Sequence, residues 1–284
     1  MRRKLFMIPA VVITLAVSVT GYAKTDQKNG KISITVITDT KCEFCPIDAA
    51  QKGLESYLPQ AAFSLMDYRA KPAQALIAKY KVTTLPCFLI PAEVKNLDGF
   101  KNISESLAQN GDKFILKQDK AGIFLFLGRH YADNEVTYFL DFYDSRTKDT
   151  FPALCEFCKE KNIKLNINII VPSVQVFGYP QQEITTALAV RKVYPDKFFD
   201  YLSERIKFIE TLDCTTSAAK MSLDINALNK ALEPAEAGQL LKDNEVLAKE
   251  LGITNGNAFL VNNVRLFMIM KAKKEDFAKI INCK

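Results

Sequence analysis

The cysteines carry most of the chemistry that this sequence offers, and two of them, Cys42 and Cys45, form a Cys-x-x-Cys pair. The pair is expected where a strand passes into a helix, with Cys42 at the helix N-terminus. Unpaired N–H groups and the positive end of the helix dipole stabilise a thiolate there, which lowers a cysteine pKa from about 8.5 into the range of about 3.5–7.5. Cys45, one turn further on, would resolve a mixed disulfide on Cys42.

This placement predicts that Cys42 is the more exposed and more acidic sulfur, while the helical turn shields Cys45. The spacing alone also fits a stapling disulfide or half of a zinc site. The surrounding sequence has to decide between these roles.

A second Cys-Glu-Phe-Cys segment runs from Cys155 to Cys158. Only residues 159–162 separate it from the next expected strand, so it is expected inside or near the end of the helix that begins at Phe151. We therefore expect structural roles for these two cysteines, as buried thiols, as a local disulfide or as partners of Cys214 and Cys283. A metal centre shared by both Cys-x-x-Cys pairs is a minor alternative, because such pairs usually stand about 15–20 residues apart.

Two further residues, Cys87 and His130, are weaker candidates for chemistry. Cys87 follows Pro86 at the start of an expected strand, where we expect a buried apolar side chain; a third redox or ligand thiol is the alternative. His130 is the one histidine of the sequence, so the chain alone cannot build the usual His-based zinc or haem site. We expect it to make a structural hydrogen bond. No metal or organic cofactor is expected, because a dithiol carries its own electrons.

The first cysteine pair lies in an expected α/β unit. Residues 31–38 alternate β-branched and polar side chains, which is typical of a strand. A strand, helix, strand order implies a parallel pair joined by a crossover. The expected elements are strand 31–38, a helix to about 57, strand 62–66, helix 72–80 and strand 87–90.

A connector follows this unit, and the α/β pattern then restarts. In the connector, residues 95–121, we expect a short helix over 103–109 and a hairpin that pairs 112–116 with 122–127. Asn262-Asn263 suits a hairpin turn in the second half, because asparagine tolerates positive φ. The two halves therefore predict a degenerate internal duplication. The elements expected in the second half are strand 136–143, helix 151–161, strand 163–171, helices within 182–250, a hairpin of 258–261 with 264–268, and helix 274–281.

The composition and the first 23 residues limit the class of protein. The chain has 284 residues, 48% apolar and 25% charged, and half of its net charge of +6 comes from Arg2, Arg3 and Lys4. So weak a basic excess, without basic runs, predicts no nucleic-acid partner. Residues 1–23 combine a basic start, an apolar stretch and small residues at a cleavage site, which predicts a signal peptide and export to the periplasm or beyond; an uncleaved membrane anchor is the alternative. The expected domains are 24–120 and 121–284.

Residues 31–90 resemble the thioredoxin family. The resemblance rests on ITVITDTKCEFC for the strand and active-site turn, on FSLMDYRAKPAQALIAKY for the next strand and helix, and on VTTLPCFL for the cis-proline loop. It implies that Pro86 is cis and packs against both cysteines, and that the backbone of Leu85 pairs with an extended substrate. Glu43 and Phe44, between the cysteines, would also contact substrate.

Two departures from the family leave the direction of electron flow open. Reductases of this kind usually carry a buried acid six residues before the nucleophile, where this chain has Val36. Glu43 and Phe44 match neither the Gly-Pro of reductases nor the histidine-containing dipeptide of strong oxidants. An ionised Glu43 would oppose thiolate formation.

Residues from about 136 onward resemble a DsbA-like domain, a thioredoxin fold with inserted helices. The resemblance rests on YFLDFYDSRTKDTFPALCEF, ITTALAVRKVYPDKFFDYLSERI and LAKELGITNGNAFLVNNVRL. It aligns Asp144 with Asp39, which places Thr147 and Thr150 at the cysteine positions and Asn257 at the position of the proline. The second domain is therefore expected to have lost its redox site.

These expectations add up to an α/β protein of two thioredoxin-like domains in tandem, the second with a helical insertion. The expected function is an exported thiol–disulfide oxidoreductase, in which Cys42 and Cys45 act on protein thiols or disulfides. The second domain would serve substrate docking, dimerisation or contact with a membrane redox partner. The alternatives are a binding or chaperone protein with a structural disulfide, and a thiolate metallochaperone for copper.

Overall fold

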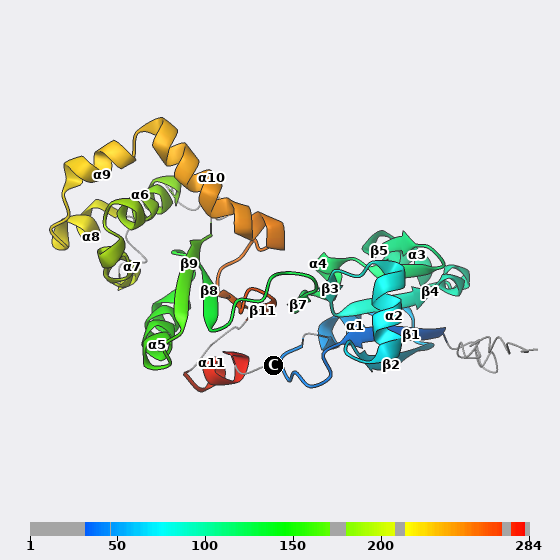
Figure 1. Ribbon diagram of the computed structural model, residues 1–284. Helices are drawn as coiled ribbons and strands as arrows, with labels where there is room; N and C mark the ends of the chain where they lie inside the picture. The colour runs from blue at the N-terminus through cyan, green and yellow to red at the C-terminus, as the bar shows by residue number, and fades with distance from the viewer. Residues whose placement is uncertain (1–31, 46, 171–179, 208–213, 269–273, 282–284) are drawn as a thin grey trace, which may run out of the picture.

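The computed structural model describes residues 32–45, 47–170, 180–207, 214–268 and 274–281. Two β-sheets flanked by helices follow one another along the chain (Figure 1). The expected α/β class is confirmed, and a group of helices is inserted in the second half.

The first sheet has the strand order β2-β1-β4-β6-β5. β1 (Ile32–Thr38) and β2 (Ala61–Asp67) are parallel and are joined by α1 (Asp48–Tyr57). α2 (Lys71–Tyr80) then leads to β4 (Cys87–Pro91), which lies antiparallel on the other side of β1. All five elements lie close to the expected ranges, because β-branched alternation and helical periodicity are strong local signals.

The remaining strands of this sheet correct the expected structure of the connector. The short helix is α3 (Phe100–Ile103), and residues 107–110, expected to be partly helical, form β5 (Leu107–Asn110) instead. β5 pairs with β6 (Lys113–Leu116) across a tight turn in which Gly111 has a φ of +60°. Glycine adopts this conformation without strain, so the hairpin forms here rather than further along the chain. Two 3₁₀ turns complete this region, η1 (Ala92–Asn96) and η2 (Ser104–Ser106).

The end of the connector belongs to the second sheet. The expected hairpin turn is a short helix, α4 (Gln118–Ala121), and β7 (Leu125–Phe126) follows it. β7 pairs antiparallel with β3 (Thr84–Leu85) on one side and with residue Arg265 on the other. The chain thus crosses from the first sheet to the second twice, at β3 and at β7.

The second sheet has the order β3-β7-β11-β10-β8-β9. β8 (Glu135–Leu140) and β9 (Lys164–Ile169) are parallel and are joined by α5 (Thr147–Glu160). β10 (Ala258–Val261) lies antiparallel to β8, and β11 (Arg265–Met268) lies antiparallel to β10. The series β9-β8-β10-β11 repeats β2-β1-β4-β6 in order and direction, so the two sheets share the arrangement of four strands.

Helices fill the interval between β9 and β10, where the sequence predicted a long helical tract. They cover one end of the second sheet (Figure 1). The hairpin of β10 and β11 turns through Asn262 and Asn263, both with positive φ, as expected. The inserted helices are α6 (Pro180–Val193), η3 (Pro195–Lys197), α7 (Phe198–Lys207), α8 (Cys214–Lys220), α9 (Ile225–Ala231) and α10 (Pro234–Leu251), and α11 (Lys274–Ile281) closes the chain.

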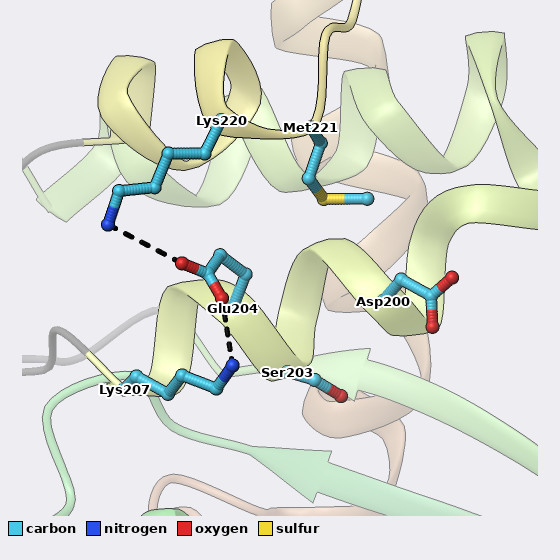
Figure 2. A pocket seen from close by; sticks show the side chains of 6 residues that line it. All are labelled: Asp200, Ser203, Glu204, Lys207, Lys220 and Met221. Carbon is cyan, nitrogen blue, oxygen red and sulfur yellow. Dashed lines mark hydrogen bonds and ion pairs between the residues drawn. The ribbon is translucent and has the colours of Figure 1, made fainter.

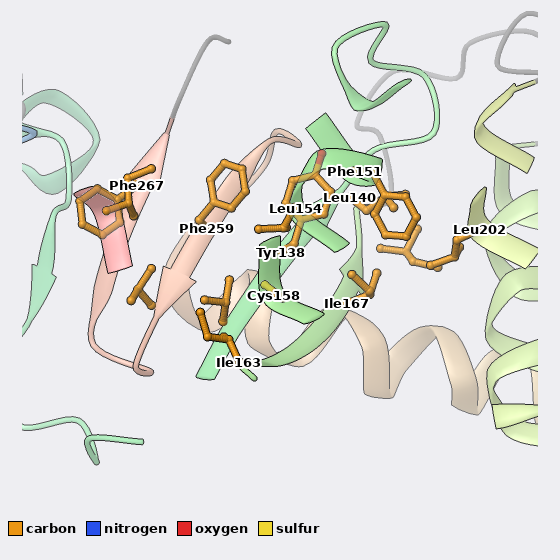
Figure 3. Packing of buried hydrophobic residues seen from close by; sticks show 14 of the residues in the cluster. Tyr138, Leu140, Phe151, Leu154, Cys158, Ile163, Ile167, Leu202, Phe259 and Phe267 are labelled. Carbon is orange, nitrogen blue, oxygen red and sulfur yellow. The ribbon is translucent and has the colours of Figure 1, made fainter. Parts of the chain in front are cut away.

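A single large core cluster includes residues from both halves. It joins Ile37, Leu85 and Leu89 of the first half to the aromatic side chains of the second sheet. Figure 3 shows the part beneath the second sheet, where Tyr138 and Phe259 stack with ring centroids 5.0 Å apart. Because apolar burial is the main stabilising contribution to a fold, the two halves are expected to stabilise each other.

The expected signal peptide, residues 1–23, lies outside the described residues. Among the helices that the structure does describe, none is long and apolar enough to cross a membrane.

Candidate thiol site

The turn after β1 carries both cysteines of the first pair. Its backbone closes twice, because the Cys42 N–H donates to the Asp39 carbonyl at 3.2 Å and the Cys45 N–H donates to the Cys42 carbonyl at 3.4 Å. The Lys41 N–H donates to Oδ1 of Asp39 at 3.1 Å. The Asp39 side chain therefore fixes the turn that presents the cysteines.

The expected position of the cysteines at the start of a helix is wrong. α1 begins at Asp48, so Cys42 and Cys45 both precede the helix. The sequence supplies the reason, because Pro46 follows Cys45 and a residue before proline is disfavoured in the helical region. The helix dipole therefore does not act on Cys42 in the way that the spacing suggested.

The two sulfurs differ in state and in exposure. Cys45 is a free thiol, whereas Cys42 is disulfide-bonded, so the two are not joined to each other. Cys42 is buried, with 8% of its surface exposed, and Cys45 is partly exposed. This order of exposure reverses the expected one. Cys87, Cys155 and Cys158 are free thiols as well, so none of them is the partner of Cys42.

Thr38, the last residue of β1, holds the Cys45 thiol. Its Oγ1 lies 2.6 Å from Sγ of Cys45, within hydrogen-bonding distance. Burial raises the pKa of the Cys45 thiol, while hydrogen bonds from Thr38 and from the Asp39 backbone favour the thiolate. The Asp39 charge raises this pKa further, and the Arg265 charge lowers it.

Asp39 is a buried acid that the sequence analysis missed as a site residue. Oδ1 of Asp39 accepts a hydrogen bond from Nη2 of Arg69 at 2.6 Å, and Oδ2 accepts one from Nη1 of Arg265 at 3.0 Å. The sequence analysis looked for an acid only at position 36, where thioredoxin-like reductases usually carry one. This chain has a fully buried valine, Val36, at that position. The available signal was an aspartate directly after a buried strand, three residues before the first cysteine. Arg265 gave no local signal, since it lies 226 residues from Asp39.

Aromatic side chains from both halves lie beside the turn. Phe44, between the cysteines, meets Phe267 edge to face with ring centroids 6.2 Å apart. Phe267 in turn meets Phe124 at 5.5 Å, and the guanidinium of Arg265 lies 5.3 Å from the Phe124 ring centroid. Glu43 is exposed. The predicted substrate contact through Glu43 and Phe44 stays a prediction, with Phe44 partly covered by the second half.

The loop with the cis proline is present, but the backbone beside it is already hydrogen-bonded within the chain. The Leu85-Pro86 peptide bond is cis, as expected. Leu85, expected to offer its backbone to a substrate, is buried, and its carbonyl accepts a hydrogen bond from the Phe124 N–H at 2.7 Å. The Leu127 N–H donates to the Thr83 carbonyl at 2.8 Å. The chain's own β7 therefore occupies the edge at which an extended substrate was expected to pair.

The turn after β8 repeats the turn after β1 bond by bond. The Asp144 N–H donates to the Asp141 carbonyl at 3.4 Å, and the Thr147 N–H donates to the Asp144 carbonyl at 2.9 Å. The Tyr143 N–H donates to Oδ1 of Asp141 at 2.8 Å. Each of these hydrogen bonds corresponds to one made by the N–H of Cys42, Cys45 or Lys41 in the first turn. The residue numbers differ by the same interval in all three cases.

This match corrects the expected equivalences. Asp141, not Asp144, is the counterpart of Asp39, so the cysteine positions are held by Asp144 and Thr147. Thr150 lies a turn further along α5. Strand register agrees with this correction, since Ile37 pairs with Cys87 and Phe139 pairs with Ala258. Pro86 and Asn257 directly precede those partners, so the expected placement of Asn257 holds.

Hydrogen bonds between neighbouring side chains close the second turn. The Tyr138 hydroxyl donates to Oδ1 of Asn257 at 2.6 Å in the interior. Nε of Arg146 donates to Oδ1 of Asp144 at 2.8 Å. The position of the first cysteine is thus held by an ion pair, and no thiol occupies either cysteine position.

The second Cys-Glu-Phe-Cys segment lies in the last two turns of α5. Burial raises the pKa of both thiols to about 12, with the neighbouring Cys158 adding to the effect on Cys155. Figure 3 shows Cys158 among the buried side chains of Leu154, Ile163 and Phe259. Cys87 is also buried, as expected, and burial raises its pKa to about 12. Thiols of this kind are poor nucleophiles near neutral pH.

Two hollows in the described surface lie away from the thiols. One, of about 420 Å³, lies between α7 and α8, where Lys207 and Lys220 both bind Glu204 (Figure 2). Another, of about 570 Å³, lies between the connector and the C-terminal end of α10, beside Met268. Among the side chains that the structure describes, no cysteine lines either one. Within the described residues, no group of three or more His, Cys, Asp or Glu side chains is arranged to hold a metal ion.

Comparison with known proteins gives fold-level likenesses only. No protein-family model matches the chain, and no curated protein matches it. Among solved structures, it is similar to the thiol-disulfide exchange protein alpha-DsbA2 from Wolbachia pipientis, with a TM-score of 0.43 and 14% identity over 56% of this chain and 88% of that one. It is also similar to the catalytic domain of Proteus mirabilis ScsC, with a TM-score of 0.42 and 18% identity over 54% and 84%. The disulfide oxidoreductase DsbA from Proteus mirabilis gives a TM-score of 0.39 and 13% identity over 55% and 85%.

Proposed function

We propose that this chain is a thiol–disulfide oxidoreductase in which Cys42 and Cys45 exchange with the thiols or disulfides of protein substrates. The observation that carries the proposal is the state of the two sulfurs. Cys42 is disulfide-bonded while Cys45, hydrogen-bonded to it through the backbone of the same turn, is a free thiol. A free thiol beside a disulfide is the arrangement from which a resolving cysteine acts.

The chemistry balances without a cofactor. Once the redox partner has reduced the disulfide at Cys42, the Cys42 thiolate attacks one sulfur of a substrate disulfide, which forms a mixed disulfide and releases the other substrate sulfur as a thiolate. The Cys45 thiolate then attacks Sγ of Cys42, which forms the Cys42–Cys45 disulfide and releases the second substrate thiolate. Two electrons pass from the dithiol to the substrate, and solvent protonates the two thiolates. The reverse sequence oxidises a substrate dithiol.

The proposal includes export, through the signal peptide expected over residues 1–23, to a compartment where disulfides persist. A membrane redox partner would restore the dithiol or the disulfide. Because β7 covers the edge of Leu85, we propose that substrates reach the thiols on the side of exposed Glu43. The alternatives of a binding protein or a copper carrier gain no specific support.

Cysteine substitutions test the proposal, with reduction of the insulin disulfides as the assay. We expect Cys42→Ser to lower the rate to that of the chemical reductant alone. We expect Cys45→Ser to accumulate a mixed disulfide with a peptide substrate, seen as added mass under non-reducing conditions, because the attacking thiol remains and the resolving one is gone.

The matched control is the double variant Cys155→Ser with Cys158→Ser, because that segment has the same Cys-Glu-Phe-Cys sequence but thiols whose pKa is raised to about 12 by burial. We expect it to exchange at the wild-type rate. Full activity in Cys42→Ser, or loss of activity in a folded control variant, would contradict the proposal.

A further inference from the structure

We propose that Arg265, on β11 of the second half, is a positioning residue for the thiol chemistry of the first half: it holds and neutralises Asp39 beneath Cys45, so that the thiolate can form. This inference rests on the proposed function for its purpose. The geometry that carries it is independent of that function. It gives the half whose corresponding turn lacks cysteines a direct part in the site.

The Asp39 carboxylate is buried and is bound by an arginine at each oxygen. Arg69 reaches Oδ1 at 2.6 Å from the same half of the chain, and Arg265 reaches Oδ2 at 3.0 Å from the other half. The two arginines differ in surroundings, because the Arg265 side chain is 8% exposed and the Arg69 side chain is 36% exposed. A buried guanidinium is screened less by solvent, so Arg265 is expected to compensate the carboxylate charge more strongly.

The second half fixes Arg265 in place. On β11, Arg265 pairs with Val261 of β10 on one side and with Leu125 of β7 on the other, so its backbone is held on both sides. Figure 1 shows β11 between β7 and the rest of the second sheet. The guanidinium also lies over the ring of Phe124, which favours a cation at that place. Arg265 is therefore preorganised to meet Asp39.

The charges around Cys45 act in opposite directions. Asp39 disfavours a thiolate and Arg265 favours it, on top of a dominant effect of burial and of hydrogen bonds from Thr38 and the Asp39 backbone. Arg69 acts through Asp39, and Asp67 binds Arg69 in turn, with Nε of Arg69 2.8 Å from Oδ1 of Asp67. Without Arg265, the buried carboxylate would keep only the exposed arginine, and thiolate formation would become harder.

Alkylation of Cys45 by iodoacetamide tests the inference without any oxidoreductase assay. The full chain is used, its disulfide is kept, and the rate at Cys45 is followed by peptide mass spectrometry from pH 7 upward until the rate reaches its plateau, because only the thiolate reacts. We expect Arg265→Met to move the midpoint of the rate profile to higher pH by about one unit, which makes alkylation about tenfold slower below the midpoint. Arg265→Lys should restore most of the wild-type profile.

Asp39→Asn is expected to move the midpoint of the rate profile in the opposite direction. It removes the carboxylate and leaves both arginines, so the midpoint should move to lower pH. Arg69→Met is the matched control, because it removes the exposed cation from the same carboxylate, and its shift should be smaller than that of Arg265→Met. General loosening of the fold would expose Cys45 in every variant and move all midpoints in one direction.

The inference is overturned if folded Arg265→Met keeps the wild-type midpoint, or if Arg265→Met and Asp39→Asn move it in the same direction. Should Arg265→Met fail to fold, Asp39→Asn decides alone, and an unchanged or higher midpoint would overturn the inference. Failure of the proposed function is distinguishable, since it would show as absent insulin reduction in a wild-type protein whose alkylation profile still responds to these substitutions as expected.

Discussion

The turn after β1 and the turn after β8 share their backbone hydrogen bonds, yet the first holds a free thiol and the second holds none. In both turns an aspartate side chain accepts a backbone N–H two residues later, from Lys41 to Asp39 and from Tyr143 to Asp141. The cysteines are therefore not needed to build the turn. Its geometry comes from the aspartate and the backbone.

The surroundings of the two aspartates differ more than the turns themselves. Asp39 is bound by two arginines, one of them from the other half of the chain. Asp141 forms no ion pair with a described arginine or lysine, and the arginine next to this turn, Arg146, binds Asp144 instead. The turn of the first half therefore carries the cysteines, whereas the turn of the second half has the same backbone bonds without them, and the second half places Arg265 against Asp39.

The largest effect that separates the two sites is expected from Tyr138→Phe. The substitution removes the hydroxyl that donates to Oδ1 of Asn257 and leaves a buried acceptor without that partner. We expect the free energy of unfolding to fall by about 1–3 kcal/mol, measured by urea denaturation. Insulin reduction at 25 °C should not change, because this hydrogen bond lies in the site without thiols.

Tyr57→Phe is the matched control, since Tyr57 is 47% exposed and the same hydroxyl is removed at the surface. Its effect on the free energy of unfolding should stay within about 0.5 kcal/mol. A loss of exchange in folded Tyr138→Phe would show that the second site takes part in the chemistry.

A smaller effect is expected where β7 covers the cis-proline loop. Leu127→Pro removes the N–H that donates to the Thr83 carbonyl, which weakens the pairing of β3 with β7 by about 1 kcal/mol. We expect faster formation of a mixed disulfide with an extended peptide, followed by intact mass, because the Leu85 edge opens more often.

Leu127→Ala controls for the lost side chain, because it keeps the N–H. An equal rate for the two variants would contradict the idea that β7 limits access to this edge. A rate below wild type in Leu127→Pro would show that β7 supports the site rather than covering it.

Local sequence signals predicted the fold well and the site only in part. The alternation over residues 31–38 and the pair Asn262-Asn263 placed β1 and the last hairpin, because strand periodicity and turn preference act over a few residues. The start of α1 was wrong because one proline outweighed the helical pattern after Cys45.

The errors at the site have a different origin. Alignment by residue type matched Asp144 to Asp39, whereas strand register and the turn hydrogen bonds match Asp141. Neither the contact of Arg265 with Asp39 nor the cover of Leu85 by β7 has a local signal, because each joins segments that meet only when the two halves pack together. Cys42 and Cys45 could be recognised as a candidate pair because the chemistry proposed for them depends on residues three apart.

The smallest effect is expected from the two carboxylates of the second turn, and its sign depends on pH. Burial raises the pKa of Asp141 above its ordinary value, so its contribution to stability is present at low pH and is lost as pH rises through the raised value. For Asp144, burial acts to raise the pKa, but hydrogen bonds from Arg146 outweigh it and lower the pKa. The contribution of Asp144 to stability is therefore present above its ordinary pKa and is lost as pH falls.

Asp141→Asn removes a buried charge at pH 7 while it keeps an acceptor for the Tyr143 N–H. Its change in the free energy of unfolding should therefore be more favourable at pH 7 than at pH 2. Asp144→Asn should destabilise the protein at pH 7 by about 0.2–1 kcal/mol, as for a solvent-screened pair, and the loss should become smaller as pH falls toward 2. Urea denaturation of both variants at the two pH values measures the difference. If Asp141→Asn also destabilised the protein at pH 7, the Asp141 charge would be stabilised by its surroundings, and the contrast between Asp39, which has arginine partners, and Asp141, which has none among the described residues, would not hold.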